Sequence, residues 1–336
     1  MSTRFFNRLS WYTLITIFLV ILAGGVVRMT GSGMGCPDWP KCFDCYIPPT
    51  SVDQLPENYK EIYSEKRKKQ IKRFVGFLKS LGFDEEAEEI LHDKSLLIEQ
   101  DFNALNTWTE YINRLMGALA GLFIFIQAVL VSLNYKKQRM IAIVLSWILV
   151  FITGFQAWFG AMVVATNIVP WVLSVHMLLA LLMIIIQLHI MKAQKSSSIT
   201  IKSKPVFFLS LVGSLLMVIQ TIVGSRVRQE IDGVKHDLDR AEWMDQLSSI
   251  FTNHQILALV ITFLAIALIV HNIRSGLLSK WIYILCGLIL FEGIVGMSFG
   301  LTNMSPILQP LHLLSSMLIF TWVYQIFIHS STNEIS

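Results

Sequence analysis

Eight apolar runs divide the chain, and each is long enough to cross a lipid bilayer. They cover about residues 11–27, 111–133, 140–164, 170–191, 206–226, 249–270, 281–301 and 307–328. A spanning helix needs roughly 20 apolar residues, because the hydrocarbon core is about 30 Å thick. Backbone that faces lipid must satisfy its own hydrogen bonds, which excludes single strands. The pattern therefore predicts an all-α membrane protein with eight transmembrane helices.

One pattern of apolar and polar positions occurs twice, beginning at Phe155 and at Phe291, so that a shift of 136 residues superposes the copies. Each copy predicts the end of one helix, a Thr-Asn-x-x-Pro turn and the start of another helix. A histidine follows about one and a half turns into that second helix, at His176 and at His312. Repeats of this kind are common in membrane proteins and fix the architecture.

The first helices of the two halves also match, because a shift of 200 residues aligns Arg28 with Arg228. We therefore predict two pseudo-twofold-related four-helix bundles, residues 1–200 and residues 201–336. The N-terminal half carries a polar insert, residues 46–107, on the extracytoplasmic side. Within it, the pattern predicts amphipathic helices at Asn58–Phe77 and Asp84–His92, with no chemistry of their own.

Composition and charge set the environment and the orientation. Hydrophobic residues make up 54% of the chain and charged residues 15%, which excludes a soluble domain. Basic residues precede the first helix and lie between helices two and three, four and five, and six and seven. The positive-inside rule then places both termini in the cytosol, and a long loop such as the insert can cross despite its charges. No cleavable signal is evident, and we expect a bacterial cytoplasmic membrane.

Three histidines lie near the starts of even-numbered helices, all of which enter from the outer side: His176, His254 and His312. Asn113 has the same place on the second helix. A single intramembrane histidine often serves only as a hydrogen-bonding residue between helices. Three at one depth in a duplicated fold favour metal ligation, and a haem iron suits them better than zinc, because no cysteine or aspartate accompanies them.

Glu110, Asn113 and Arg114 are spaced to share one helix face. A carboxylate at the membrane boundary indicates a functional site if it is buried. The alternative is an interfacial glutamate that pairs with Arg114 in water. For Arg28 and Arg228 the alternatives are snorkelling to the interface or binding an anionic group such as a propionate.

Three cysteines follow the first helix: Cys36, Cys42 and Cys45. A loop on the outer side faces an oxidising compartment, which favours a disulfide. The spacing does not choose between Cys36–Cys42 and a pairing with Cys45. The bond could be a structural staple or a redox-active pair that relays electrons.

These residues together resemble the haem A synthases of bacterial and mitochondrial membranes. The most specific motif is TGSGMGCPDWPKC at residues 30–42, supported by GGVVR at 24–28, EYINR at 110–114 and the two repeated turns. The resemblance covers nearly all of the chain except the insert, 46–107. It implies two four-helix halves and the oxidation of the C8 methyl group of haem O to a formyl group, which supplies haem A for cytochrome oxidase assembly.

The resemblance also implies roles for single residues. His254 and His312 resemble the iron ligands of a resident haem b in the C-terminal half. His176 resembles a ligand of the substrate, haem O, in the N-terminal half. Glu110 resembles the catalytic glutamate of the family, and Arg28 and Arg114 are assigned to the substrate haem.

The resemblance also concerns Arg228, two cysteines and one position on the second helix. Arg228 is assigned to haem b, and Cys36 and Cys42 resemble the cysteine pair of the outer loop. The family commonly has Glu-x-x-His-Arg on the second helix, whereas this chain has Asn113 in place of that histidine. Asn113 then faces the substrate haem without being a strong iron ligand.

The expected partners are haem O, a haem O synthase that supplies it, a quinol or other membrane electron donor, and the lipid bilayer. A homo-oligomer is compatible with the sequence, and no nucleic acid is expected. Two other functions remain open at this point. One is a non-catalytic b-type membrane cytochrome that transfers electrons from quinol, and the other is a haem or small-molecule transporter.

Overall fold

A computed structural model describes residues 3–38, 40–134, 139–166, 169–194, 201–234, 238–276 and 279–331. Within these ranges, eight helices are long and apolar enough to cross a membrane. They are α1 (Thr3–Thr30), α4 (Ala104–Leu133), α5 (Met140–Ala165), α6 (Pro170–Gln194), α7 (Lys204–Val234), α8 (Ser249–Ser275), α9 (Ser279–Leu301) and α10 (Leu308–Ile328). The prediction of an all-α protein with eight spans is confirmed.

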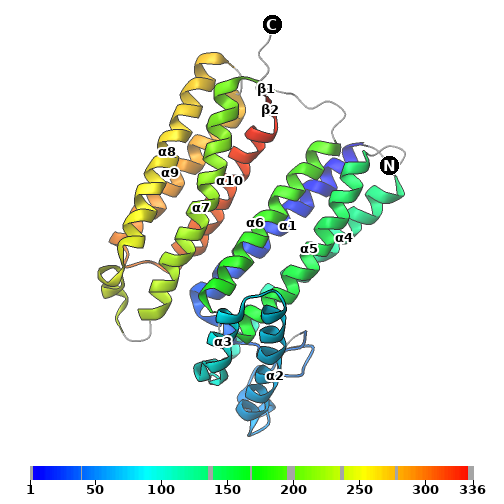
Figure 1. Cartoon of the computed structure of the whole chain (residues 1–336), viewed down its shortest axis with the longest axis vertical. Helices are drawn as coiled ribbons and strands as arrows, with labels where there is room; N and C mark the ends of the chain where they lie inside the picture. Colours follow the sequence, from blue (N-terminus) through cyan, green and yellow to red (C-terminus); the bar gives the residue numbers. More distant parts are fainter. Residues whose placement is uncertain are drawn as a thin grey trace.

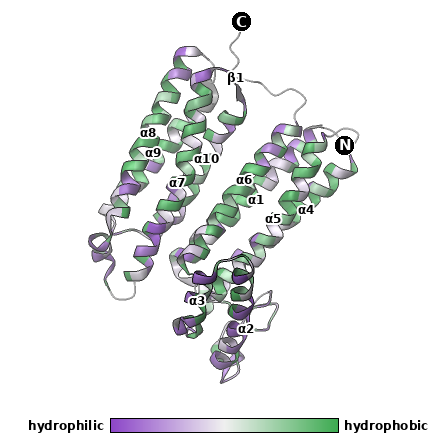
Figure 2. Ribbon diagram, viewed as in Figure 1, coloured by the Kyte–Doolittle hydropathy of each residue, from purple (hydrophilic) through white to green (hydrophobic). Residues whose placement is uncertain are grey.

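Several helices extend beyond their apolar runs. The fifth run ends near residue 226, but α7 continues to Val234 and so carries Arg228 and Asp232 on helical backbone. Hydropathy marks the part of a helix that can lie in hydrocarbon, whereas backbone hydrogen bonds continue through its polar ends. Figure 2 shows this division, with apolar helix centres and polar ends. Large apolar side chains such as Phe151 and Phe263 point outward, as expected for a surface that lipid covers.

The spanning helices form two groups, α1 with α4, α5 and α6, and α7 with α8, α9 and α10 (Figure 1). The groups meet where α10 packs on α1 and α6 and where α6 packs on α7. Gly25 makes the first of these contacts close, since a Cβ there would lie 3.0 Å from the Cβ of Pro310. The helix α1 begins and α10 ends at the same end of the molecule. The pseudo-twofold relation, the division at residue 200 and the cytosolic location of that end stay predictions.

Two short strands join the ends of the C-terminal helices. They are β1 (Ile201–Lys202) and β2 (Ser330–Ser331), which pair in parallel with Ile201 opposite Ser330. The amide of Ile201 donates to the carbonyl of His329 at 2.7 Å. This pair connects the start of α7 to the end of α10, and no sequence pattern predicted it.

The insert lies at the opposite end of the molecule, which we call the insert end (Figure 1). Its helices are α2 (Tyr59–Ser80) and α3 (Asp84–His92), close to the predicted bounds. Phe74 of α2 packs its ring 6.3 Å from that of Trp158 on α5, which attaches the insert to the N-terminal bundle. Short 3₁₀ helices complete the described elements: Ser32–Met34, Val52–Gln54, Lys94–Leu97 and Arg240–Gln246.

A buried ion pair holds the insert together. Arg67 of α2 is 1% exposed and donates to the carboxylate of Glu99 at 2.9 Å. Its other terminal nitrogen donates to the carbonyl of Leu96. Burial raises the pKa of Glu99 and lowers the pKa of Arg67, while each partner's charge opposes that change. Each of the two buried charges is therefore stabilised by the other.

Candidate functional site

The loop after α1 contains the disulfide. Cys36 is bonded to Cys42, and Cys45 is a free, exposed thiol. Of the two pairings that the spacing left open, the structure therefore has Cys36–Cys42. Cys42 and Cys45 instead exchange two backbone hydrogen bonds, at 3.0 and 3.1 Å.

A tight turn orders the rest of this loop. Phe43 and Asp44 both have positive φ, 54° and 59°, as the two central residues of a type I′ turn require. The carboxylate of Asp38 accepts the amide hydrogens of both residues, at 2.7 and 2.8 Å. Asp38 thus offsets the backbone strain of the turn with two charge-assisted hydrogen bonds.

The loop lies directly against the start of α4. A Cβ on Gly35 would lie 2.6 Å from the backbone of Asn106, so only glycine fits there. The hydroxyl of Thr107 donates to the carbonyl of Gly35 at 2.9 Å. This close approach brings the backbone of Cys36 within reach of the next turn of α4.

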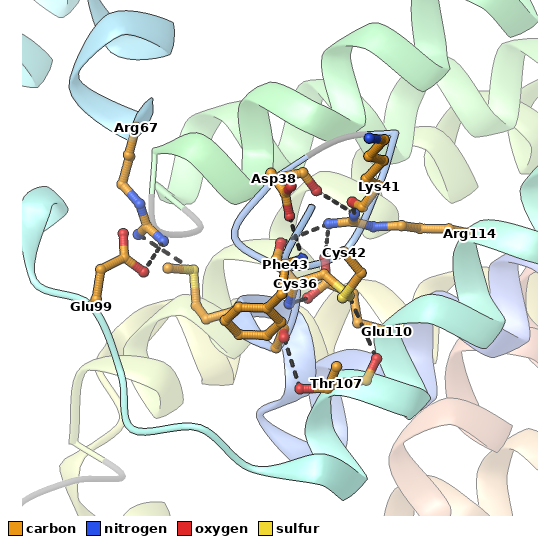
Figure 3. A network of polar contacts seen from close by, with 12 residues as sticks. Cys36, Asp38, Lys41, Cys42, Phe43, Arg67, Glu99, Thr107, Glu110 and Arg114 are labelled. Atoms are coloured by element: carbon orange, nitrogen blue, oxygen red, sulfur yellow. Dashed lines mark hydrogen bonds and ion pairs between the residues drawn. A yellow bond between two sulfur atoms is a disulfide. The ribbon is translucent and has the colours of Figure 1, made fainter. Parts of the chain in front are cut away.

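Glu110 occupies that next turn. Its Oε2 accepts the amide hydrogen of Cys36 at 2.7 Å, and its Oε1 accepts from Arg114 (Figure 3). The side chain is 3% exposed. Glu110 does pair with Arg114, as one interpretation of the sequence expected, but the pair is buried and not in water. The sequence correctly placed both side chains on one face, yet gave no sign of the third partner, the backbone of the loop.

Arg114 joins the loop to α4 at several points. Its two terminal nitrogens donate to the carbonyls of Cys36, Asp38 and Lys41, as well as to Glu110 (Figure 3). A planar guanidinium can serve these acceptors at once, whereas an ammonium group could not. The role predicted for Arg114 at the substrate haem stays a prediction, and the observed role is to hold the disulfide loop.

Glycines face the histidine rings in three consecutive helix pairs. The pairs are Gly160–His176, Gly224–His254 and Gly296–His312. A Cβ on these glycines would lie 3.1, 3.1 and 3.7 Å from Cε1 of the respective ring. In the remaining pair, α1 and α4, a Cβ on Gly24 would lie 3.9 Å from Oδ1 of Asn113. Asn113 therefore faces a glycine of the preceding helix, as the three histidines do.

A polar residue lies one helical turn before each of the three ring-facing glycines, and sequence reasoning missed all three. Gln156 donates to the backbone carbonyl of His176 at 2.9 Å, and Gln220 donates to that of His254 at 3.1 Å. The third residue is Glu292, which sits beside His312. The duplication contained the signal, because the repeated segments begin Phe-Gln and Phe-Glu.

His254 and His312 face each other across the C-terminal bundle. Their ring centroids are 6.4 Å apart, with the planes at 68°. Two imidazoles on opposite sides of one metal need roughly 6 Å between centroids, given metal–nitrogen bonds of about 2 Å. Within the described ranges, Nδ1 of His254 has no hydrogen-bond partner. The donor set and spacing fit a haem iron held by two histidines.

The N-terminal bundle offers one histidine at this level. His176 is packed against Gly160, and its Nδ1 has no hydrogen-bond partner among the described residues. The Oδ1 atom of Asn113 likewise has none there. No cluster of three or more His, Cys, Asp or Glu side chains suited to a bare metal ion occurs in the described part of the chain.

Arg28 and Arg228 share one carboxylate between the two halves. Arg28 donates to Oδ2 of Asp232 at 2.8 Å, and Arg228 donates to Oδ1 at 3.0 Å. Arg228 also donates to Gln309 of α10. The sequence assigned each arginine to a different haem, but here they meet at Asp232, a residue that the sequence did not single out. Among the described contacts, two guanidinium groups share one carboxylate, which leaves one positive charge in excess.

Three further histidines lie at the end away from the insert and have protein partners. His189 contacts the hydroxyl of Tyr324 at 3.0 Å, and His271 contacts that of Ser203 at 3.2 Å. His329 contacts the carbonyl of Gln325. These contacts are structural, and no role in ligation is needed for them.

Three residues of the repeated and loop motifs, Trp39, Asn167 and His236, lie outside the described residues.

An eight-span helical bundle with facing intramembrane histidines is typical of membrane proteins that bind haem. The sequence model of one family, described as cytochrome oxidase assembly protein, matches residues 7–79 and 83–324. The chain belongs to this family. The two matched segments meet at the turn between α2 and α3, so the match includes the insert. The expectation that the family resemblance leaves out residues 46–107 is therefore wrong.

Curated relatives agree with this assignment. The chain is similar to "Heme A synthase" of Pelagibacter ubique (strain HTCC1062), with 25% identity over 250 residues, or 71% of this chain and 66% of that protein. It is also similar to "Heme A synthase" of Ehrlichia canis (strain Jake), with 22% identity over 91% of this chain and 87% of that protein. The first alignment spans just under two thirds of the relative. The chain is a multi-pass protein of the cytoplasmic membrane, as its spanning helices and these bacterial relatives together show.

Proposed function

We propose that the chain is a haem A synthase, an oxidoreductase that converts the C8 methyl group of haem O to a formyl group. The match of one family model to nearly the whole chain carries this proposal. The curated name of the relatives, "Heme A synthase", supports the product. A non-catalytic cytochrome would explain the histidines equally well, but not those names.

The C-terminal bundle is proposed to hold a resident haem b. His254 and His312 are its ligands, and their ring separation of 6.4 Å supports this assignment. When bound, the haem supplies a one-electron redox centre. The two histidines hold it between α8 and α10, close to the positive junction at Arg228 and Asp232, which suits an anionic propionate.

The N-terminal bundle is proposed to bind haem O as the substrate. His176 orients its iron from α6, and Asn113 lies on α4 in the setting that a histidine has in the other helix pairs. Arg28, with its guanidinium at the junction, is the candidate for a propionate. With Asn113 opposite, the substrate iron has one strong protein ligand.

Glu110 is proposed to be the catalytic carboxylate. Oxidation of a methyl group releases protons, and a fixed carboxylate can accept them or stabilise developing positive charge. Two donors, Arg114 and the amide of Cys36, hold both of its oxygens. The Cys36–Cys42 disulfide fixes the second donor, so the redox state of the cysteines and the position of Glu110 are linked. A quinol or another membrane carrier is the proposed electron donor, and a haem O synthase the proposed supplier.

The proposal is tested by expressing the chain with a haem O synthase in a host that makes no haem A. Haems are then extracted from the membranes and identified by mass. We expect haem A with the native chain and a strong decrease with Glu110→Gln at equal protein level. If a folded, haem-loaded chain yields haem O and haem b alone, it is a cytochrome and not a synthase.

A further inference from the structure

Glu292 is the single charged residue in the span Tyr283–Leu301 of α9. A carboxylate inside a membrane span is costly, and such residues usually face the bundle interior and serve a function. Glu292 has no place in the function proposed above. Its side chain is 20% exposed and points toward α10, where it meets His312 and Ser315.

The contacts of Glu292 differ from those of its counterparts. Gln156 and Gln220 each use an amide nitrogen to donate to the backbone carbonyl of the facing histidine. A carboxylate has no such donor. Instead, Oε2 of Glu292 accepts the hydroxyl of Ser315, and Oε1 lies 3.1 Å from Nδ1 of His312. Gln220 also lies 3.5 Å from a ring nitrogen of His254, but that nitrogen is Nε2. Glu292 is the one residue of the three that approaches Nδ1 of the ring it faces.

If His312 binds a metal through Nε2, its Nδ1 does not bind the metal. Nδ1 is the nitrogen that Glu292 approaches. A histidine ligand generally donates its second N–H to a carboxylate, a carbonyl or water, which fixes the tautomer and the ring orientation and makes the ligand more basic. A more basic imidazole stabilises the oxidised iron relative to the reduced iron. The ring and carboxylate are at ion-pair distance without hydrogen-bond alignment, so a small rotation of the ring must accompany ligation.

We propose that Glu292 is a positioning residue that accepts the Nδ1 hydrogen of His312 and thereby lowers the reduction potential of the haem in the C-terminal half. The inference rests on the proposed function insofar as it requires a haem at His254 and His312. Of the two histidines that would hold the haem, His312 would have a carboxylate partner and His254 would not, because Gln220 faces His254.

The test compares the midpoint potential of the haem in the purified full-length chain and in Glu292→Gln. Glutamine is the residue at both equivalent positions, so the fold should tolerate it. We expect an unchanged low-spin spectrum and a midpoint potential shifted to a more positive value. Glu292→Asp keeps the charge at a shorter reach and should shift the potential less. Ser298→Ala, on the same helix but bonded only to the carbonyl of Ile294, should leave it unchanged.

The outcomes separate the two ideas. A haem-loaded Glu292→Gln variant with the native potential would overturn the role of Glu292 and leave the proposed function intact. A native chain that binds no haem at His254 and His312 would overturn both. If Glu292→Gln loses its haem, the midpoint potential of Glu292→Asp decides the matter. A shift to a more positive value supports the proposal. The native potential in Glu292→Asp, as expected for the control Ser298→Ala, would refute it.

Discussion

Single atoms decide how the disulfide loop contacts α4. Gly35, Glu110 and Arg114 each act through contacts with backbone, and no pattern of side-chain types reveals such contacts. The carboxylate of Glu110 reaches the amide of Cys36 only because Gly35 lets the loop approach the backbone of Asn106. The chemistry proposed for Glu110 thus depends on a glycine that has no chemistry itself.

Gly35→Ala should therefore impair the site from a distance. The new Cβ would lie 2.6 Å from the backbone of Asn106, which has no room to move without bending α4. We expect a loss of about 1–3 kcal/mol in stability, as for other overpacked sites, and a decrease in haem A formation. Gly76→Ala is the matched control, since nothing lies within 4 Å of its new Cβ. It should stabilise α2 by about 0.5–1 kcal/mol. Thermal unfolding in detergent measures both, and equal effects would contradict the packing argument.

Arg114→Lys should loosen the loop while keeping the charge. Arginine serves three loop carbonyls and Glu110, and a lysine ammonium cannot reach them all. Each lost hydrogen bond to a charged group costs about 1.5–3 kcal/mol. We expect the Cys36–Cys42 bond to be reduced faster by a thiol reagent than in the native chain. An unchanged reduction rate would mean that Arg114 does not hold the loop closed.

The helices and their connections show where sequence patterns suffice. The apolar runs predicted eight spans and the polar periodicity predicted α2 and α3, because each of these elements buries or exposes a continuous face. The end of α7 at Val234 was missed, since its last turns are polar. The pairing of β1 with β2 was missed because two-residue strands carry no periodicity.

The functional site could also be predicted from the sequence in part. Their places near the starts of even-numbered helices predicted one level for His176, His254 and His312, and the structure brings two of them to facing positions. Asp232 was missed because its two partners come from different halves, and sequence alone does not reveal which surfaces of the halves meet. Glu292 could have been found, since the 136-residue shift sets it against Gln156.

The insert provides a test of one element. Glu99→Gln leaves Arg67 buried without its counter-charge, and removing one member of a buried ion pair costs about 3–5 kcal/mol. We expect α2 and α3 to be cleaved readily by an added protease in this variant. Replacing both residues, as Arg67→Met with Glu99→Leu, should recover most of the protection. A double variant that is as labile as Glu99→Gln would show that the ion pair is not the cause.

The two halves are connected through Asp232, which two arginines share. Asp232→Asn removes the anion between Arg28 and Arg228 and leaves two partly buried cations facing each other. We expect a loss of about 1–3 kcal/mol in stability, since charged groups lose hydrogen-bond partners. The loss should be larger at low salt, where the repulsion between the arginines is less screened. Thermal unfolding at two ionic strengths measures it, and a native-like melting temperature at both would contradict a structural role for the junction.

The two bundles are proposed to have different tasks, with a resident haem in the C-terminal half and the substrate in the N-terminal half. The most direct measurement is the visible spectrum of the purified chain and of two histidine variants, made without haem O. We predict that the native chain and His176→Ala both show a low-spin b-type haem, and that His312→Ala loses it. A low-spin haem that persists in His312→Ala, or that disappears in His176→Ala, would contradict this division between the halves.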